Sequence, residues 1–442
     1  MTAPEGRAGP GWLAGRYADY IVLDSDPDVP QIAADYWELS ADSYARVHAH
    51  VRAFAAADQA ASAACQRLAG APADPARWRA AQAALAGLLG SRPAALAAGT
   101  ELVAGADARI WIDHWLGAGY QPAARPYRLA DLPPAVSRPA SSPRAGSRRA
   151  PRAVGPPQPA GSAGPGVRAS APRVHVVIPF RDNEGGVRLR NLAACLHALR
   201  DQDYPASLTQ VTVVETDTRP RWREVIEPLA SRYLHAHKDG DFNKSWTINV
   251  GLRSGGRPGA PGTAELSCVL DADILVDRSF LTRNAARLAG PQQQAHLPFR
   301  WSLSLDEVST DRALRIRVAG RAARVDEAVL RGLLLREPPG GCLWARTALL
   351  HRIGGYDERF EGWGGEDDDM AARISQAAPL ARFGDPLLHL NHPRPVMVRA
   401  DGQAMNAHLL GDRGGAPAWT GAAGFGDPAR FAAAGRPAED RR

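Results

Sequence analysis

The strongest constraint on this chain is residues 360–369 (FEGWGGEDDD), where a turn rich in Gly and Trp runs directly into four consecutive acids. Neighbouring carboxylates repel one another, so a folded chain tolerates such a run where it is solvated or where its members face a proton, a cation or a sugar hydroxyl. A solvated helix start is one interpretation, because acids in a first helical turn complement the helix dipole and residues 370–374 can continue the helix. The three glycines permit close backbone approach, and the indole of Trp363 offers a flat face that stacks on a sugar ring. These flanking residues favour a sugar-binding site.

Composition sets the broad class of the protein. A chain of 442 residues with 45% hydrophobic and 23% charged residues can bury a sizeable core and is expected to form two or three domains. The four cysteines are scattered and form no C-x-x-C pair, which indicates neither a disulfide framework nor a zinc site and favours a reducing compartment. The first 20 residues hold no apolar leader, and no apolar run approaches the ~20 residues that span a bilayer. We therefore expect a cytoplasmic protein with no transmembrane segment.

Low-complexity sequence divides the chain. Residues 131–172 are rich in Pro, Ala, Ser, Gly and Arg and are expected to form a disordered linker, whose arginines either solubilise it or contact an anionic surface. The formal charge of +6 is concentrated there rather than on a patterned face, so no nucleic-acid partner is predicted. Residues 11–130 contain Ala-rich helical runs and predict a mostly helical domain of unknown function. Residues 411–442 predict a low-complexity, poorly ordered tail. Because a disordered tether transmits few contacts, residues 173–442 are expected to fold alone.

After the linker, strands alternate with helices. Apolar and β-branched runs predict strands at 174–180, 211–215 and 266–270, and helical periodicity predicts helices at 187–199 and 246–252. This alternation predicts an α/β domain, with a mainly parallel sheet covered on both faces. Ligands of such sheets bind at the carboxyl ends of the strands, so the chemistry is expected where these three strands end.

Two acids directly follow the third of these strands. Asp271 and Asp273, at i and i+2, place hard oxygen ligands at the mouth of a buried strand, which suits a divalent cation that also contacts a diphosphate. Taken alone, this D-x-D pattern is also common in turns. His389 and His392 lie in a later apolar run, and an imidazole is a common further ligand for a manganese-like metal. A structural histidine is the other interpretation for each, and the sequence leaves open which of the two binds metal.

The order of the motifs resembles that of β-1,4-galactosyltransferases. The motifs are VIPFRD at 177–182, FNKSWTINVG at 242–251, DAD at 271–273, GG at 340–341 and GWGGEDDD at 362–369. The set looks like a GT-A glycosyltransferase, and it also resembles the catalytic domains of chondroitin-polymerase-like enzymes and polypeptide N-acetylgalactosaminyltransferases. The resemblance covers about residues 173–410. It implies an α/β fold of the GT-A type, which is a Rossmann-like nucleotide-diphospho-sugar transferase fold, with a separate mostly helical N-terminal domain.

The resemblance also implies a set of site residues. The donor nucleotide is expected to contact Pro179, Phe180, Arg181, Glu215, Phe242, Lys244 and Asp271. The sugar and the acceptor are expected to contact Gly341, Trp363, Gly364, Glu366 and Asp368. Metal ligands are expected among Asp271, Asp273, His389 and His392. Asp367 is expected to be the catalytic base.

These roles predict an inverting glycosyltransferase that depends on Mn²⁺ (or Mg²⁺). The enzyme would transfer galactose or an N-acetylhexosamine from a UDP-sugar to a hydroxyl of a carbohydrate, a small molecule or a glycoconjugate. Two alternatives stay open. A catalytically inactive homologue that binds sugar or nucleotide would lose the base or the metal acids, and a metal-dependent phosphohydrolase would not need a Gly-Trp turn beside its acids. The sequence chooses neither the donor sugar nor the acceptor.

Overall fold

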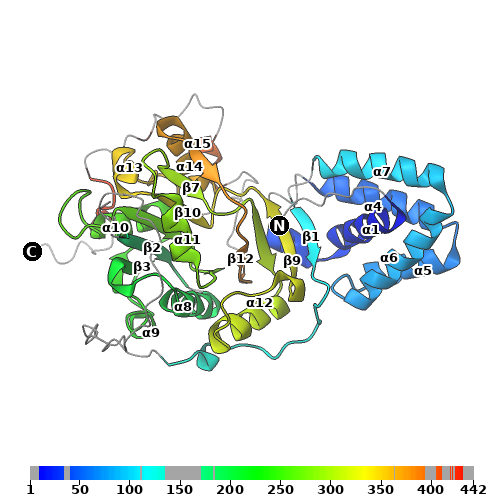
Figure 1. Cartoon of the computed structure of the whole chain (residues 1–442), viewed down its shortest axis with the longest axis horizontal. Coiled ribbons are helices and arrows are strands. Elements are labelled where there is room, and N and C mark those ends of the chain that lie inside the picture. The colour runs from blue at the N-terminus through cyan, green and yellow to red at the C-terminus, as the bar shows by residue number, and fades with distance from the viewer. Residues whose placement is uncertain are drawn as a thin grey trace, which may run out of the picture.

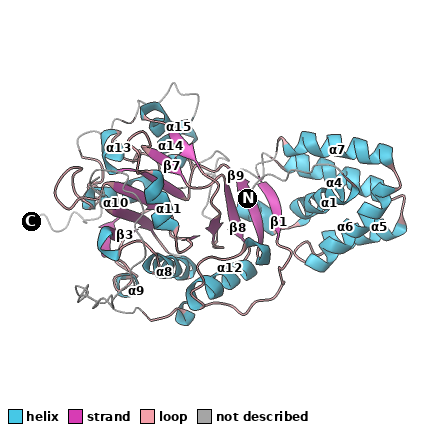
Figure 2. Ribbon diagram, in the orientation of Figure 1, coloured by secondary structure: helices cyan, strands magenta, loops and turns pink. Residues whose placement is uncertain are grey.

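The computed structural model describes residues 9–33, 40–109, 112–134, 171–182, 185–362, 364–393, 405–410, 419, 421 and 424–431. Helices of the N-terminal region form one end of an elongated molecule, and two sheets with their covering helices form the other (Figure 1). The strands lie almost entirely in this second part (Figure 2). Trp363 and residues 135–170 of the expected linker lie outside the described residues.

Six described helices build the N-terminal region. Capping explains two of their starts, because Asp58 accepts a hydrogen bond from Ala61 N and Asp74 accepts one from Ala76 N, both at 2.8 Å. Helix α1 is the central one, and its Leu13, Tyr17, Tyr20 and Ile21 are fully buried. No helix in the described part of the chain is long and apolar enough to cross a membrane. The helices are α1 (Pro10–Ser25), α2 (Asp28–Ala33), α4 (Ala41–Ala55), α5 (Gln59–Ala69), α6 (Pro75–Gly90) and α7 (Pro93–Asp107).

A seven-stranded sheet forms the centre of the second part, in the order β11-β7-β10-β5-β2-β3-β4. Strands β5, β2, β3 and β4 run parallel, while β10 pairs antiparallel with both β5 and β7. The strands are β2 (Val174–Phe180), β3 (Thr209–Asp217), β4 (Arg232–His237), β5 (Leu266–Leu270), β7 (Ala295–Leu297), β10 (Cys342–Arg346) and β11 (Leu380–Arg382). The α/β class and the three strands predicted from the sequence are confirmed.

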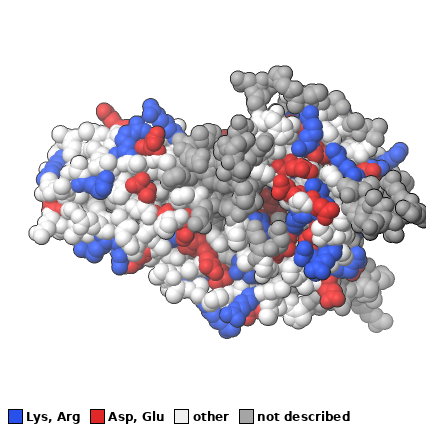
Figure 3. Space-filling view, turned by 180° about the vertical axis from the view of Figure 1, so that it is seen from behind, with Lys and Arg blue, Asp and Glu red and all other residues white. Residues whose placement is uncertain are grey.

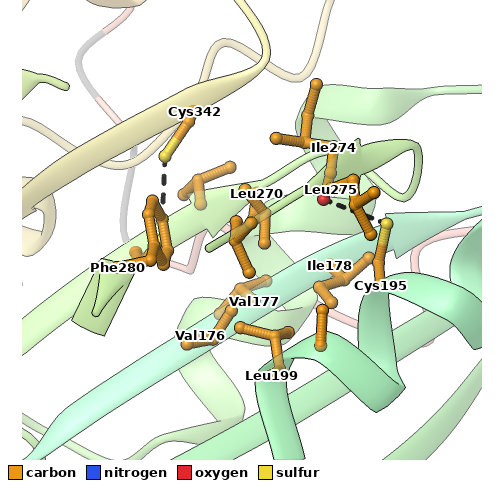
Figure 4. Packing of buried hydrophobic residues seen from close by; sticks show 14 of the residues in the cluster. Val176, Val177, Ile178, Cys195, Leu199, Leu270, Ile274, Leu275, Phe280 and Cys342 are labelled. Carbon is orange, nitrogen blue, oxygen red and sulfur yellow. Dashed lines mark hydrogen bonds between the residues drawn. The ribbon is translucent and has the colours of Figure 1, made fainter. Parts of the chain in front are cut away.

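Helices cover both faces of this sheet. Helix α8 packs Cys195 and Leu199 against Val176 and Ile178 of β2 (Figure 4). On the opposite face α10 approaches so closely that a side chain at Gly251 would overlap Val177. The helices of this part are α8 (Val187–Arg200), α9 (Arg223–Ile226), α10 (Lys244–Ser254), α11 (Phe280–Arg287), α12 (Glu307–Leu314), α13 (Thr347–Arg352), α14 (Glu366–Ala377) and α15 (Ala407–Leu410). A π-helical turn (Arg315–Ala319) and 3-10 turns (Leu129–Asp131, Ala206–Leu208, Glu327–Val329) complete it.

A second, five-stranded sheet has the order β1-β9-β8-β12-β6. Its strands are β1 (Ile112–Leu116), β6 (Ile274–Leu275), β8 (Trp301–Leu305), β9 (Arg331–Arg336) and β12 (Leu387–His389). Strand β1 precedes the linker, yet it pairs antiparallel with β9 over five residues, from Ile112 opposite Leu335 to Leu116 opposite Arg331. The region expected to be helical up to residue 130 therefore contributes an edge strand to a sheet of the second part.

Buried contacts join the two parts. Leu333 of β9 belongs to the hydrophobic core of the N-terminal helices together with Ile112. Arg331 donates to Asp26, which follows α1, at 2.6 Å, and both side chains are only 6% exposed. The same guanidinium lies 3.2 Å from Asp306. A shared core and a buried ion pair replace the loose tethering that the linker composition suggests.

The end of the chain also departs from expectation. Although its composition predicts a poorly ordered tail, residues 424–431 are described and pack on α10, where the Phe431 and Trp246 rings meet edge-to-face at 4.8 Å. The neighbouring residues 411–418 and 432–442 lie outside the described residues.

A fragment of residues 171–442 is expected to aggregate, contrary to the expectation from sequence. Without β1, the polar edge of β9 is unpaired, and Leu333 loses its apolar cover. Soluble yield and size-exclusion chromatography measure the effect, with residues 9–442 as the reference. A soluble, monomeric fragment would show that the second part folds without the N-terminal helices.

Candidate active site

Two backbone pairings place the acids and histidines that follow β5 and β12. Asp271 N donates to Gly341 O at 3.0 Å, and Leu390 N donates to Asp273 O at 2.9 Å. Strand β12 pairs antiparallel with β6, so His389 lies opposite Ile274, the residue after Asp273. The sheet register thus sets a carboxylate beside a histidine that is more than 100 residues away in sequence.

Asp273, His389 and His392 come together as one group, which we name the metal group. The Nε2 atom of His392 lies 3.0 Å from Asp273 Oδ2, and the Nε2 atom of His389 lies 3.5 Å from Oδ1. One ligand atom from each residue lies within 4.8 Å of the others. Burial raises the pKa of Asp273, but the two imidazoles and Arg188, whose Nη1 is 3.9 Å from Oδ2, more than offset this and hold it well below its usual value.

The metal group fits a divalent cation. Asp273 Oδ1 is buried and accepts no hydrogen bond from the described residues, which is an unusual condition for a carboxylate oxygen. One carboxylate and two imidazoles are donors that suit Mn²⁺ and similar ions. Both histidines that the sequence offered as alternatives lie in the group. Asp271 does not, although it was expected among the metal ligands.

Asp271 instead belongs to a second group, the Lys244 cluster. The ammonium of Lys244 lies 3.2 Å from Asp271 Oδ2, 3.3 Å from Glu366 Oε1 and 2.7 Å from Asp367 Oδ2. Lys244 is the first residue of α10, and Glu366 is the first residue of α14. Gly340 packs so closely on Asp367 that any side chain there would overlap the carboxylate. One cation is therefore shared by three acids from two separate parts of the sequence.

This sharing sets the electrostatics of the site. Burial raises the pKa of Glu366 to about 7, and Asp367 adds to this effect while Lys244 opposes it. Burial likewise raises the pKa of Asp271 to about 6, again against Lys244 and with help from Asp367. Burial and Asp367 also raise the pKa of Asp368. For Lys244, burial lowers the pKa, but the three carboxylates together raise it well above its usual value.

The expected donor residues lie where the parallel strands end. Pro179 and Phe180 close β2, and Phe180 is buried. The guanidinium of the next residue, Arg181, donates to the carbonyls of Gly240 at 2.7 Å and Lys238 at 2.8 Å, so it fastens the loop before α10. The half-buried Phe242 lies in that loop.

Glu215, which the resemblance expects to contact the donor nucleotide, lies near the end of β3. It is fully buried in β3, and its carboxylate accepts hydrogen bonds from Arg221 N at 3.1 Å and Tyr233 Oη at 2.5 Å. A third contact comes from Trp222 N at 3.4 Å. These contacts give Glu215 a role in shaping the turn after β3.

The expected acceptor residues surround the start of α14. Gly341 and Gly364 both have positive φ, and Glu366 is buried. Trp363 lies outside the described residues. On the face shown in Figure 3, acidic side chains gather in the α/β part with basic side chains beside them.

Two residues near the site were missed from the sequence. Asn243 caps α10, and its Oδ1 accepts from Trp246 N at 2.8 Å, which the pattern of Asn before a helix could have indicated. Arg188, in the first turn of α8, approaches Asp273 with no local sequence signal.

Comparisons with known proteins agree with the motifs. A sequence model described as "N-terminal domain of galactosyltransferase" matches residues 335–382, which include Gly341 and the acidic run. The resemblance drawn from the motifs is confirmed over these residues. A search of curated proteins finds no match.

Solved glycosyltransferase structures are also similar to the chain. The mannosyltransferase PcManGT of Pyrobaculum calidifontis, solved with GDP-Man and Mn²⁺, matches with a TM-score of 0.34 and 22% identity over 51% of this chain and 59% of its own. TarS of S. aureus matches with a TM-score of 0.35 and 15% identity over 49% and 60%. The catalytic domain of Drosophila β1,4-galactosyltransferase 7, solved with xylobiose, matches with a TM-score of 0.26 and 18% identity over 48% and 64%. The chain thus spans about three-fifths of each of these proteins.

The metal group generates a binding prediction. Asp273→Asn, His389→Ala and His392→Ala are each expected to weaken Mn²⁺ binding by roughly tenfold or more, because each removes one of three donors. Asp271→Asn is the matched control and is expected to leave Mn²⁺ affinity almost unchanged. Calorimetric titration with Mn²⁺ alone measures all four. A loss in Asp271→Asn as large as in Asp273→Asn would move the metal to the D-x-D pair.

The buried Glu366 generates a pH prediction. Because its folded-state pKa of about 7 lies above its usual 4.5, the protonated form contributes stability that is present below pH 4.5 and is lost as pH rises through 7. Glutamine cannot ionise, so Glu366→Gln is expected to gain on the order of 1–3 kcal/mol relative to wild type between about pH 5 and pH 8. Denaturant unfolding in chelator at both pH values measures this. If the free energies of unfolding of wild type and Glu366→Gln change with pH in parallel, the raised pKa of Glu366 is contradicted.

Proposed function

We propose that the chain is a metal-dependent glycosyltransferase that moves a sugar from a nucleotide diphosphate sugar to an acceptor hydroxyl. The observation that carries this proposal is the juxtaposition of two groups at one edge of the sheet. Residues 271–273 join the metal group to the Lys244 cluster, which contains the acidic run matched by the galactosyltransferase model. A site for cations thus lies directly beside candidate bases. The donor is a UDP-sugar of the galactose or N-acetylhexosamine class, and the acceptor is a carbohydrate or glycoconjugate.

The donor half of the site handles negative charge. A Mn²⁺ or Mg²⁺ ion held by Asp273, His389 and His392 would neutralise charge on the departing diphosphate. Arg188 beside Asp273 and Lys244 beside Asp271 supply further positive charge near the metal group, and such cations stabilise charge that develops on a leaving group. The half-buried Phe242, in the loop before α10, offers apolar surface for the nucleobase, while Phe180 at the end of β2 belongs to the core beneath it.

The acceptor half of the site handles a proton. Asp367 stands at the start of α14, where its carboxylate is held between Lys244 and the backbone of Gly340. As the acceptor oxygen attacks the anomeric carbon, its proton passes to Asp367, and the bond from that carbon to the diphosphate oxygen breaks. Attack from the face opposite the leaving group inverts the configuration, so an α-linked donor yields a β-glycoside.

Lys244 connects the two halves. Its ammonium lies 2.7 Å from Asp367 Oδ2 and 3.2 Å from Asp271 Oδ2, so it pairs with both the candidate base and the acid that precedes the metal group in sequence. An incoming diphosphate competes with the three carboxylates for this ammonium. When Lys244 pairs with the diphosphate, its ion pair with Asp367 is lost, and the carboxylate is open to the acceptor hydroxyl.

The inactive-homologue alternative is less well supported by the geometry. An inactive binding module has no need to keep both a three-residue metal group and a buried acid cluster, and this chain brings both together. Transfer from a panel of UDP-sugars to carbohydrate acceptors, with and without chelator, tests the proposal. Absence of transfer and of hydrolysis across the panel would overturn it.

The base assignment predicts a specific rank among variants of the acidic run. Asp367→Asn keeps the side-chain shape but cannot accept a proton, so kcat is expected to fall by roughly 10²- to 10⁴-fold. Binding of the Mn²⁺-UDP complex is expected to change by less than about threefold. Steady-state transfer rates and calorimetric titration with UDP measure the two quantities.

Matched substitutions separate a positioned base from general electrostatics. Glu366→Gln and Asp368→Asn each remove one carboxylate from the same run and are expected to reduce kcat much less than Asp367→Asn does. Equal losses in the three variants would mean that the run acts through its summed charge. A near wild-type rate in Asp367→Asn would leave the mechanism without its base.

A further inference from the structure

The last described segment of the chain lies against the elements that carry the Lys244 cluster. Residues 424–431, which we name the C-terminal clamp, lie within residues 411–442, for which the sequence predicts a poorly ordered tail. Trp246 of α10 donates its indole N–H to Asp427 O at 2.8 Å, and its ring packs on Phe431. Gly426 approaches the helix backbone so closely that a side chain there would overlap the carbonyl of Asn249. The segment thus makes a hydrogen bond, an aromatic contact and a close backbone contact with α10, as in a well-packed interface.

A buried carboxylate fastens the clamp. The side chain of Glu358 is 2% exposed and lies in the loop before the acidic run. Its Oε1 accepts from Asn249 Nδ2 at 2.9 Å and from Gly426 N at 2.5 Å, and its Oε2 pairs with Arg430. One carboxylate therefore joins α10, the loop and the clamp. Without Arg430 this charge would be buried with no ionic partner among the described residues.

The same loop is bound along α10 by two buried asparagines. Asn249 Oδ1 accepts a hydrogen bond from Tyr356 N, and Asn249 Nδ2 donates one to Tyr356 O, both at 2.8 Å. Asn243 donates to Glu358 O at 2.8 Å, and Gly362 N donates to Phe242 O at 2.9 Å. These bonds run from Asn249 in the middle of α10 to the N-cap Asn243 and to Phe242 just before it. They therefore fix the loop end that enters the acidic run against the helix end that carries Lys244.

A further ionic contact lies at the outer edge of this arrangement. Lys238 is 7% exposed, its ammonium is 3.1 Å from Glu361 Oε1, and it lies 4.6 Å from the centre of the Phe431 ring. The clamp thus also contacts the loop before α10. Arg181 holds the same loop through a hydrogen bond to Lys238 O.

We propose that the C-terminal clamp is a positioning element of the active site. Glu358 and Arg430 set the distance between α10 and the loop of residues 355–362, and this distance decides whether Lys244 reaches Asp271 and Asp367 together. The inference rests on the proposed function, because it assigns the clamp to the same site. It makes residues 424–431 a required part of the catalytic unit.

The metal group provides an internal reference for the test. Its ligands follow β5 and lie in and after β12, and none of the contacts of the clamp described above involves them. A clamp variant is therefore expected to bind Mn²⁺ with wild-type affinity while losing transfer. A change that merely loosens the whole fold would weaken both.

Four full-chain variants and one truncation test the proposal. Arg430→Ala, Glu358→Gln and a chain ending at residue 423 are expected to lower kcat/KM by about 10- to 100-fold, because small misplacements of catalytic groups have effects of that size. Arg430→Lys keeps the charge and is expected to recover part of the loss. Arg321→Ala is the matched control, since this exposed arginine pairs with Asp201, which Arg317 and Arg278 also bind. It is expected to stay within about twofold of wild type.

Hydrogen exchange gives a readout that does not depend on activity. In Arg430→Ala the amides of residues 355–362 are expected to exchange faster, while those of residues 387–390 keep their wild-type protection. If wild type transfers sugar and the chain ending at residue 423 does so equally well, the clamp proposal is overturned and the proposed function stands. A parallel loss of Mn²⁺ affinity and transfer in every clamp variant would also overturn it. If wild type transfers no sugar, unchanged exchange in residues 355–362 overturns the positioning claim, and faster exchange confined to them supports it.

Discussion

The ammonium of Lys244 is the interaction on which the geometry of the site depends. It holds together Asp271, Glu366 and Asp367, three acids that burial would otherwise drive apart or force to take up protons. The cluster has one positive charge and three carboxylates. Because the pKa of Glu366 is raised to about 7, this carboxyl still holds a proton in part of the protein molecules near neutral pH. Exchange of a cation contact and exchange of a proton are the two events that the proposed transfer to a hydroxyl requires, and this cluster contains the groups for both.

The two sheets supply this cluster with fixed positions. Parallel pairing of β5 with β2 and antiparallel pairing with β10 bring Asp271 beside Gly341, and the β6–β12 pairing brings Asp273 beside His389. The second sheet then continues through β8 and β9 to β1, so the N-terminal helices rest on the same sheet that carries a metal-group histidine. The helical region is therefore a support for the active-site sheet, with Arg331 and Asp26 as its buried fastening.

Local sequence predicted what local physics decides. The apolar run at 174–180 forms β2, and the helical periodicity at 187–199 forms α8. In each case the local structure is the one that buries the apolar side chains. The D-x-D acids and both histidines were found because their chemistry is rare beside apolar strands. The pairing of β1 with β9 was not predictable, since the partners are about 220 residues apart and neither carries a signal for the other. Composition likewise described residues 411–442 as rich in Gly, Ala, Pro and Arg, but it could not show that Phe431 and Arg430 have partners in Trp246 and Glu358.

The division of the D-x-D pair illustrates why spacing alone does not assign roles. Asp271 and Asp273 are two residues apart, yet one faces an ammonium and the other faces two imidazoles. The same burial acts on both carboxyls, but their partners differ, so the pKa of Asp271 rises to about 6 while that of Asp273 falls well below its usual value. Asp273 therefore stays ionised and suits a metal, whereas Asp271 pairs with Lys244. A short acidic turn in this way links the metal group, which we propose to receive the leaving group, to Lys244, which pairs with the proposed base.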